Sequence, residues 1–425
     1  MQDNGKKPAL RFKGFTDPWE QRKLDEAFDF TVPNNTLSRA ELNQESGSVR
    51  NVHYGDVLIK YGSVLDAQND ELPFITGRSK DDFKGALLQN GDIIIADTAE
   101  DETTGKVCEI VNIQDKDVVA GLHTMVCRPK NKTAEGYFGY YMNSSSYHHQ
   151  LLPLMQGIKV LSLSKTNVQK TTVKYPKDKA EQQKIADCLR RIDTLITLHQ
   201  RKYEKLVNIK KSMLDKMFPQ NGASVPEIRF KGFTDPWEQR KLEEYLEVSG
   251  QKNFEGIYTK EDVLSVSGDF GIVNQIEFQG RSFAGASVAN YGVVETGDIV
   301  YTKSPLKSNP YGIIKANKGK NGIVSTLYAV YKPKQSANPE FVQNYFEQDA
   351  RMNNYMHPLV NKGAKNDMKV SAENALKGQI VFPDIKEQRT ISEFFRNLDT
   401  LITLHQRKLE KLQNIKKSCL EKMFV

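Results

Sequence analysis

The chain has 425 residues, enough for two to three ordinary domains with full hydrophobic cores. Its 60 basic and 53 acidic residues give a net charge of +7, which permits a polyanionic partner without identifying one. The 4 cysteines stand singly, so we expect reduced structural thiols rather than disulfides or a zinc site. No apolar run is long enough for a membrane span and the N-terminus is polar, so we expect a soluble cytoplasmic protein.

A block of fourteen residues, RFKGFTDPWEQRKL, occurs twice without a difference, at 11–24 and 229–242. Its Asp-Pro-Trp-Glu sequence has the order of an N-cap and the first three helical positions, which predicts that a short helix begins at Asp17 and at Asp235. Both tryptophans of the protein lie in this block, at Trp19 and Trp237. We interpret them as packed anchors that begin each half of the chain, not as ligand contacts.

After this block, each half is rich in β-branched and aromatic residues interrupted by Gly, Asn and Pro, as in HYGDVLIKYGSV from His53. Short strands are predicted at Asp92–Ala96 and Asp298–Tyr301. The two GDI segments that contain them are 206 residues apart, whereas the opening blocks are 218 apart, so the first half carries twelve extra residues before this point. We expect the halves to share a β-rich fold with different loops, and loops of this kind commonly carry function.

Each half closes on a long helical pattern, and 193–218 matches 399–424 at 22 of 26 positions. Apolar or seam residues recur at steps of four and three, as in a coiled coil. In the first half they are Ile185, Leu189, Ile192, Ile196, His199, Tyr203, Leu206, Met213 and Met217. In the second half they are Ile391, Phe395, Leu398, Ile402, His405, Leu409, Leu412, Cys419 and Met423. The two helices are therefore predicted to pack on each other, with both histidines as packed seam residues.

These repeats predict an α+β protein with two pseudo-two-fold-related β-rich recognition domains joined by two long antiparallel coiled-coil helices. The predicted parts are a first domain at 1–180, a first helix at 181–218, a linker at 219–228, a second domain at 229–386 and a second helix at 387–425. Antiparallel helices would bring the C-terminus near the start of the first half. A helix of that length spans roughly 57 Å, more than one turn of duplex DNA at about 34 to 36 Å, so both domains could reach one duplex.

With this organisation, the chain resembles the DNA-specificity subunits of type I restriction-modification systems. The resemblance covers nearly the whole chain and rests on the alternation of diverged domains with repeated helices. It also rests on a lead-in motif, carried by Pro176, Glu181, Gln182, Ile185 and Leu189 and again by Pro383, Glu387, Gln388, Ile391 and Phe395. The first copy has one more residue between Pro and Glu than the second.

The resemblance implies a non-catalytic subunit that binds a bipartite DNA sequence, with one half-site per domain and an unread spacer set by the helices. It implies double-stranded DNA, two modification (methyltransferase) subunits and restriction (motor and nuclease) subunits as partners. S-adenosylmethionine, ATP and Mg²⁺ are then expected on those partners and no cofactor on this chain. Independently, the sequence lacks the GxxxxGK[ST] loop of an ATP-driven motor.

Base edges in the major groove are read mainly by Arg, Lys, Asn and Gln, and phosphates are bound by Lys and Arg. Such residues follow predicted strands or lie in loops of both halves. In the first half the DNA-contact candidates are Lys60, Tyr61, Arg78 and Lys80, and in the second half they are Lys303, Lys307, Asn309 and Tyr311. The segment 309–311 also resembles an amino-methyltransferase motif, but it lacks the second proline and no glycine-rich cofactor loop accompanies it.

Two features recur at the same place in both halves although their surroundings have diverged. Lys159 and Lys365 each follow a Gly-x pair, which indicates a shared phosphate-contacting loop. Downstream, a Ser and an Asn three residues later recur as a second shared DNA element or as helix caps, at Ser164, Asn167, Ser371 and Asn374.

The polar flanks of the helices are rich in basic residues that are candidates for the partner-subunit interface, namely Arg201, Lys202, Lys205, Arg407, Lys408 and Lys411. Such residues also suit a simple solvated face. The principal alternative function is a coiled-coil scaffold whose two β-rich domains bind proteins rather than DNA.

Overall fold

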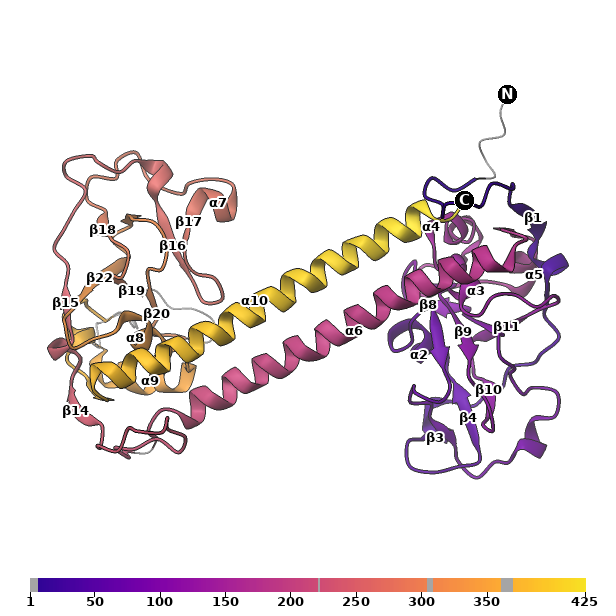
Figure 1. The fold of residues 1–425 in the computed structure, drawn as a ribbon, viewed down its shortest axis with the longest axis horizontal. Helices are drawn as coiled ribbons and strands as arrows, with labels where there is room; N and C mark the ends of the chain where they lie inside the picture. Colours follow the sequence, from indigo (N-terminus) through magenta and orange to yellow (C-terminus); the bar gives the residue numbers. More distant parts are fainter. Residues whose placement is uncertain (1–6, 221, 304–308, 361–369) are drawn as a thin grey trace. The chain divides into compact units, whose positions relative to one another are not determined.

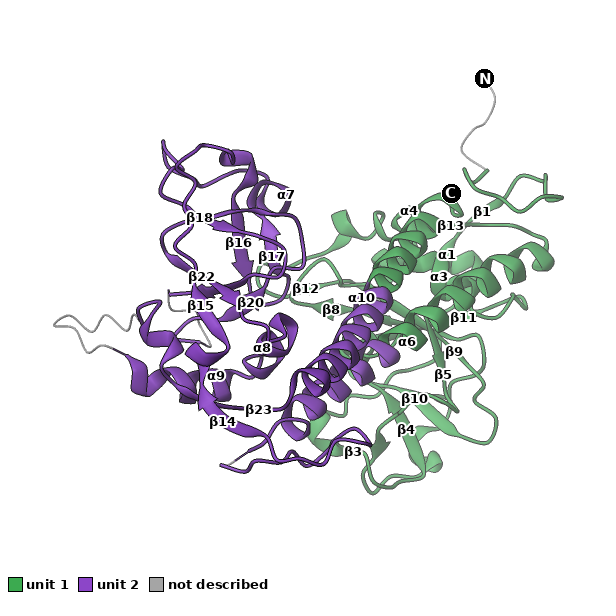
Figure 2. Cartoon of the chain, turned by 60° about the vertical axis from the view of Figure 1, so that its left-hand side comes forward, with its two compact units in different colours: residues 1–200, 407–425 green, residues 201–406 purple. Residues whose placement is uncertain are grey.

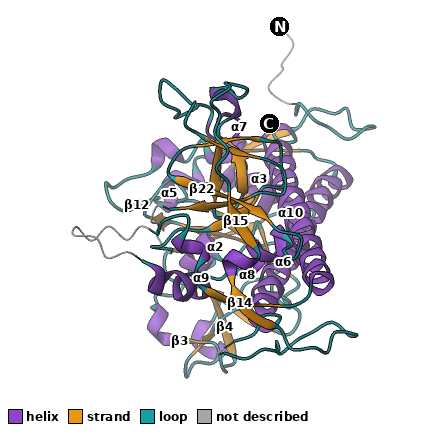
Figure 3. Ribbon diagram, turned by 90° about the vertical axis from the view of Figure 1, so that its left-hand side faces the viewer, coloured by secondary structure: helices purple, strands orange, loops and turns teal. Residues whose placement is uncertain are grey.

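In the computed structural model, residues 7–220, 222–303, 309–360 and 370–425 are described. The chain divides into two compact units (Figure 2): unit 1 comprises residues 1–200 and 407–425, and unit 2 comprises residues 201–406. Each unit therefore contains one diverged domain together with part of both long helices. In both units short strands and short helices are separated by extensive loops (Figure 3). Among the described residues, no helix combines the length and the apolar character needed to cross a bilayer.

Unit 1 is built on two sheets, with strand orders β2-β11-β7-β9-β5 and β10-β4-β6-β3. Its strands are β1 (Glu20–Lys23), β2 (Phe28–Asp29), β3 (Leu42–Asn43), β4 (Val49–Val52), β5 (Val64–Asp66), β6 (Phe74–Ile75), β7 (Ile93–Ala96), β8 (Thr98–Ala99), β9 (Val107–Val111), β10 (Asp117–Ala120), β11 (Thr124–Pro129), β12 (Leu161–Ser162) and β13 (Thr172–Tyr175). Its helices are α1 (Leu24–Ala27), η2 (Arg39–Glu41), α2 (Tyr54–Ile59), η3 (Lys80–Phe83), α3 (Tyr137–Met142), α4 (Ser145–His148), η4 (Leu152–Leu154), α5 (Lys165–Gln169) and the first part of α6 (Lys179–Lys216).

Unit 2 has a smaller sheet of order β15-β22-β19-β20 and separate strand pairs β16-β17 and β18-β21. Its strands are β14 (Glu238–Lys241), β15 (Leu246–Val248), β16 (Leu264–Ser267), β17 (Gly271–Asn274), β18 (Gly292–Val294), β19 (Ile299–Thr302), β20 (Ile314–Ala316), β21 (Gly322–Val324), β22 (Tyr328–Pro333) and β23 (Gln379–Phe382). Its helices are η5 (Leu242–Glu244), η6 (Lys260–Asp262), α7 (Gln275–Gln279), α8 (Pro339–Tyr345), α9 (Asp349–Met356), η7 (His357–Leu359), η8 (Asn374–Leu376) and the first part of α10 (Ile385–Lys422).

The Asp-Pro-Trp-Glu segments do not begin helices, and this prediction was wrong. Both glutamates instead begin strands: β1 pairs antiparallel with β13, and β14 pairs in the same way with β23. The aspartates hold the chain through their backbone, because the carbonyl of Asp17 accepts a hydrogen bond from Arg11 and that of Asp235 accepts one from Arg229. Pairing with a strand about 150 residues away outweighs a local capping pattern. Both tryptophans are buried, at 2% and 3% exposure, as the anchor interpretation predicts.

The strands predicted around the GDI segments are confirmed as β7 and β19. The segment that begins at His53 is instead the helix α2. The His53 side chain caps this helix by accepting a hydrogen bond from the backbone N–H of Gly55 at 3.2 Å. A polar cap followed by one apolar turn therefore outweighs the high content of β-branched residues.

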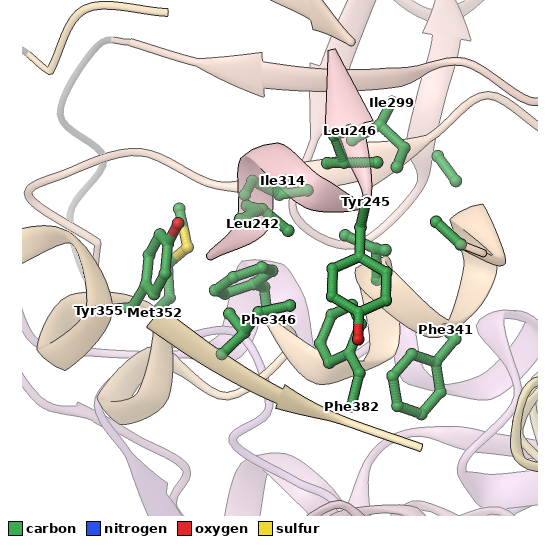
Figure 4. Close-up of a cluster of buried hydrophobic side chains, with 14 of the residues drawn as sticks. Leu242, Tyr245, Leu246, Ile299, Ile314, Phe341, Phe346, Met352, Tyr355 and Phe382 are labelled. Atoms are coloured by element: carbon green, nitrogen blue, oxygen red, sulfur yellow. The ribbon is translucent and has the colours of Figure 1, made fainter. Parts of the chain in front are cut away.

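Each unit has an apolar core that joins the sheet to the long helices. In unit 2, residues from the sheet and from α8 and α9 form one cluster, which includes Leu246, Ile299, Phe341 and Phe382 (Figure 4). The same cluster contains residues of α6 and α10. The corresponding cluster in unit 1 contains Trp19, residues of α3 and the last residues of the chain. The helices are thus integral to the core of each unit.

The helices α6 and α10 pack together, and within each unit they run antiparallel, as predicted. In unit 1, Lys416 of α10 forms an ion pair with Asp193 of α6 at 2.6 Å. In unit 2, Lys210 of α6 forms the equivalent pair with Asp399 of α10 at 2.8 Å. The predicted seam residues are buried or partly buried along both helices. The fold class is therefore confirmed, and α6 and α10 each begin two residues before the predicted starts.

Candidate nucleic-acid interface

The repeated motifs build the same polar anchor in both units. The guanidinium of Arg11 donates two hydrogen bonds to the carboxylate of Glu181, at 2.7 and 2.8 Å. Arg229 donates two hydrogen bonds to Glu387, both at 2.7 Å. The glutamate side chains are only 2% and 1% exposed, and a bidentate guanidinium supplies both the charge and the geometry that a buried carboxylate needs. The opening block is thereby fastened to the start of the long helix.

The glutamines of the lead-in motifs fasten the same helix starts to the loop before α3 or α8. Gln182 accepts a hydrogen bond from the backbone N–H of Ala134 and donates one to the carbonyl of Pro176. Gln388 accepts a hydrogen bond from the backbone N–H of Asn338 and donates to the carbonyl of Pro383. Both amides are buried, and each is hydrogen-bonded through its oxygen and its nitrogen, as buried polar groups require.

A phenylalanine just beyond the end of each helix completes an aromatic cluster. Phe424 lies 5.8 Å from the ring of Tyr137 and 5.6 Å from that of Tyr141, centroid to centroid. Phe218 occupies the same position in unit 2, where its ring lies 5.5 Å from Phe341 and 5.9 Å from Tyr345.

Beside these rings, the backbone before each opening block meets the end of a long helix. The N–H of Leu10 donates to the carbonyl of Lys422, and that of Ile228 donates to the carbonyl of Lys216. Each opening block therefore lies at the end of the helix that arrives from the other domain's sequence, as antiparallel helices predict.

The diverged parts carry the DNA-contact candidates, and Arg78, Lys80 and Lys159 are exposed in loops or at a turn. Arg78 and Lys80 lie at the start of η3, where Ser79 caps the turn through the Asp82 carboxylate. Lys159 is exposed in the tight loop between η4 and β12. Gly157 is required in this loop, because it has φ +122° and a Cβ there would lie 1.9 Å from the carbonyl oxygen of Val160. These three residues remain predicted contacts.

Two candidates are buried and cannot reach DNA, so their assignment is corrected. Tyr61 is 3% exposed and donates its hydroxyl hydrogen bond to the carbonyl of Glu71, because α2 turns the ring into the core. Asn309 is 5% exposed and donates to the carboxylate of Asp349 at 2.6 Å. Neither side chain offers a free edge to a base.

Ser164 is the N-cap of α5, and Ser371 accepts an equivalent hydrogen bond just before η8, which favours the cap interpretation for the serines; each asparagine contributes its backbone N–H. The Ser164 hydroxyl accepts a hydrogen bond from the backbone N–H of Asn167 at 3.3 Å. The Ser371 hydroxyl accepts one from the backbone N–H of Asn374 at 3.1 Å. The serines therefore shape the turns that precede β13 and β23.

The remaining candidates have mixed positions. Lys60 follows α2 rather than a strand and donates to the carbonyl of Glu71. Lys303 is partly buried at the end of β19, and burial lowers the pKa of its ammonium, with nearby Lys252 adding to the effect. Tyr311 is partly buried, with its ring edge-on to His357 at 6.1 Å. Lys307 and Lys365 lie outside the described residues.

All of the predicted partner-interface residues are exposed on the helices: Arg201, Lys202, Lys205, Arg407, Lys408 and Lys411. Sequence reasoning did not single out Leu198 and Leu404, which together with Leu195 and Leu401 are exposed at equivalent positions of α6 and α10, each at 43% to 45%. It also overlooked stacked arginines in the diverged parts. The heptad pattern could have indicated the leucines, since they fall outside the seam. Among the described residues, no group of three or more His, Cys, Asp and Glu side chains is placed to hold a metal ion.

Comparison with known proteins finds a family match in the first half of the chain. Residues 16–208 match the family described as the type I restriction modification DNA specificity domain. This match covers the first diverged domain and most of α6. Over its whole length, the chain is similar to the putative type I restriction enzyme MjaX specificity subunit of Methanocaldococcus jannaschii, at 22% identity over 94% of this chain and 91% of that protein.

Two solved structures of specificity subunits align with nearly the whole chain. The type I S subunit from M. genitalium aligns with a TM-score of 0.59 at 14% identity, over 99% of both chains. The HsdS subunit from Thermoanaerobacter tengcongensis aligns with a TM-score of 0.42 at 16% identity, over 97% of this chain and 98% of that one. At these identities the M. genitalium likeness establishes the fold.

Proposed function

We propose that this chain selects a bipartite DNA sequence for a type I restriction-modification complex. Each diverged domain reads one half-site, and α6 and α10 set the unread spacer. The chain is similar to specificity subunits, which are non-catalytic, so we assign methylation and cleavage to separate methyltransferase and restriction subunits. Those partners would carry S-adenosylmethionine, ATP and Mg²⁺.

One observation carries this proposal: the same contacts join the opening block and the long helices in both units, whereas the strands and loops of the two diverged domains differ. The Arg–Glu anchor, the aromatic cluster completed by Phe424 or Phe218, and the helix ion pair occur in both units. In contrast, unit 1 has sheets of five and four strands where unit 2 has one of four strands and separate pairs. A scaffold that presents two different surfaces in equivalent settings suits the recognition of two different half-sites.

The proposal is tested by expressing the chain with its cognate modification subunit in a host that lacks other methyltransferases. Sequencing of the methylated bases should show one motif made of two short specified parts and an unspecified gap. In gel shifts, a duplex with this motif should bind in a salt-sensitive way. If the complex assembles and methylates without a bipartite motif, or if the chain binds proteins but no DNA, the scaffold function is favoured instead.

A further inference from the structure

An arginine in the diverged part of unit 2 is held in a stacked position on the surface. The guanidinium carbon of Arg281 lies 4.6 Å from the ring centroid of Phe283. Both side chains are exposed, Phe283 at 57%. The arginine follows α7 directly, because Gly280 ends that helix with φ 74°. An exposed phenylalanine contributes little hydrophobic stabilisation, so its stacking against the Arg281 guanidinium suggests that it positions this arginine.

The loop that carries this pair is fixed by a side chain of the preceding helix. The Gln275 carbonyl oxygen accepts a hydrogen bond from the backbone N–H of Phe283 at 2.7 Å. Its amide nitrogen donates to the hydroxyl of Ser265 on β16 at 3.0 Å. Both ends of the amide are therefore engaged, and the backbone of Phe283, two residues after Arg281, is linked through Gln275 to β16.

The surroundings leave the arginine available for a ligand. Within the part of the chain that the structure describes, no carboxylate forms an ion pair with Arg281. The elements β16, β17 and α7 lie together at the end of unit 2 remote from β14 and β23 (Figures 1 and 2). Arg281 thus lies in the part of the unit that differs from unit 1, away from the repeated scaffold.

These properties match what direct base recognition requires. The guanidinium donates hydrogen bonds in a rigid fork, and the bidentate contact of arginine with O6 and N7 of guanine is the commonest specific contact in the major groove. Stacking on an aromatic ring restricts the side chain before binding, so that less conformational entropy is lost on contact. A phosphate contact would not need this restriction, since a mobile lysine suffices.

We propose that Arg281, positioned by Phe283 and Gln275, reads a guanine in the half-site bound by the second domain. This proposal rests on the proposed function, and it names one base of the target and the side chain that reads it.

The test compares the complexes formed by the wild-type chain, Arg281→Lys and Arg240→Lys with the cognate modification subunit. Lysine keeps the charge but cannot form the bidentate contact. Arg240 is an exposed arginine of the same unit, on the repeated strand β14 and paired with Glu238, so it serves as the matched control. For each complex the methylated motif is sequenced, and the binding of duplexes with each base change is measured against salt.

Arg281→Lys should relax one G·C position of one half-site, reducing discrimination there by roughly 5- to 140-fold, and leave the other half-site and the salt slope unchanged. Phe283→Leu should relax the same position to a smaller degree. Arg240→Lys should leave the motif unaltered. A wild-type motif with both half-sites unchanged in Arg281→Lys would overturn the assignment of Arg281 alone. A wild-type complex without any bipartite motif would instead overturn the proposed function.

Discussion

The two buried glutamates of the lead-in motifs, Glu181 and Glu387, each depend on a single arginine for charge compensation. Each carboxylate is removed from water and compensated by one arginine from the opening block. A buried charge that loses its partner costs far more than a surface pair is worth. The arginine at the start of the repeated opening block therefore supplies the charge that each carboxylate needs, and the tryptophan supplies packing around it.

Arg229→Leu should destabilise unit 2 by about 3 kcal/mol, because Glu387 would remain buried without its guanidinium. This is the lower end of the usual range, since solvent reaches part of the arginine. Urea unfolding followed by residue-resolved hydrogen exchange should place the loss in unit 2. Arg240→Leu, which breaks an exposed pair on β14, should change stability little. Equal losses in the two variants would contradict the role of burial.

Glu109 makes the stability of unit 1 dependent on pH. Burial raises the pKa of this carboxyl to about 7, although the backbone N–H groups of Gly136 and Gly139 donate to it and oppose the shift. The folded state then holds a proton that the unfolded state releases near its ordinary pKa of 4.5. Stability is therefore highest below that value and falls as the pH rises towards 7.

The Glu109→Gln variant should lose this dependence while keeping one carbonyl oxygen as acceptor for one of the two glycine N–H groups. Between pH 5 and pH 8, the free energy of unfolding of the wild type should fall by up to about 3 kcal/mol more than that of the variant. Chemical unfolding at both pH values gives the comparison. Parallel pH curves for the two proteins would show that Glu109 does not titrate as described.

At the level of single residues, the sequence indicated which kinds of side chain suit DNA contact, but not which of them are exposed. Tyr61 and Asn309 have the right chemistry for DNA contact, but tertiary packing buries them. Arg281 has the same chemistry and was passed over, because its stacking on Phe283 depends on a hydrogen bond from a loop to Gln275 that no local pattern reveals.

At the level of elements, periodic patterns were reliable and isolated ones were not. The seam of α6 and α10 repeats over many turns, and its spacing predicted both helices to within a few residues. The Asp-Pro-Trp-Glu segment is too short to carry a period, and the partner that makes it a strand, β13 or β23, is distant in sequence. Long-range strand pairing is the information that a local reading lacks.

Phe424 and Phe218 complete separate aromatic clusters, so removing either ring should destabilise only the unit that contains it. Phe424→Ala removes a ring that is 3% exposed and contacts Tyr137 and Tyr141, and it should destabilise unit 1 by about 3 to 5 kcal/mol. Phe218→Ala should do the same to unit 2. Hydrogen exchange measured on each variant should show faster opening in one unit only. Matched loss of protection in both units would mean that they unfold as one.

At the level of the whole molecule, the repeated scaffold separates positioning from specificity. Lys159→Ala should weaken binding to every DNA sequence by a similar factor and reduce the salt slope by about one, because an exposed lysine in a shared loop is expected to contact phosphate. Arg281→Lys should show the reverse behaviour, with an altered motif and an unaltered slope. Titrations at several salt concentrations test the difference, and an unchanged slope for Lys159→Ala would rule out its phosphate contact.

The placement of Phe424 also affects the order in which the protein is made and folded. Residues 407–425 belong to the first unit but leave the ribosome only after all of residues 201–406. Domains commonly fold in the order of their synthesis. Here unit 2 has a contiguous sequence, so its core can form first. The core of unit 1 contains both Trp19 and Phe424, so it stays incomplete until the last residues have been synthesised. The half that is translated first is therefore completed last.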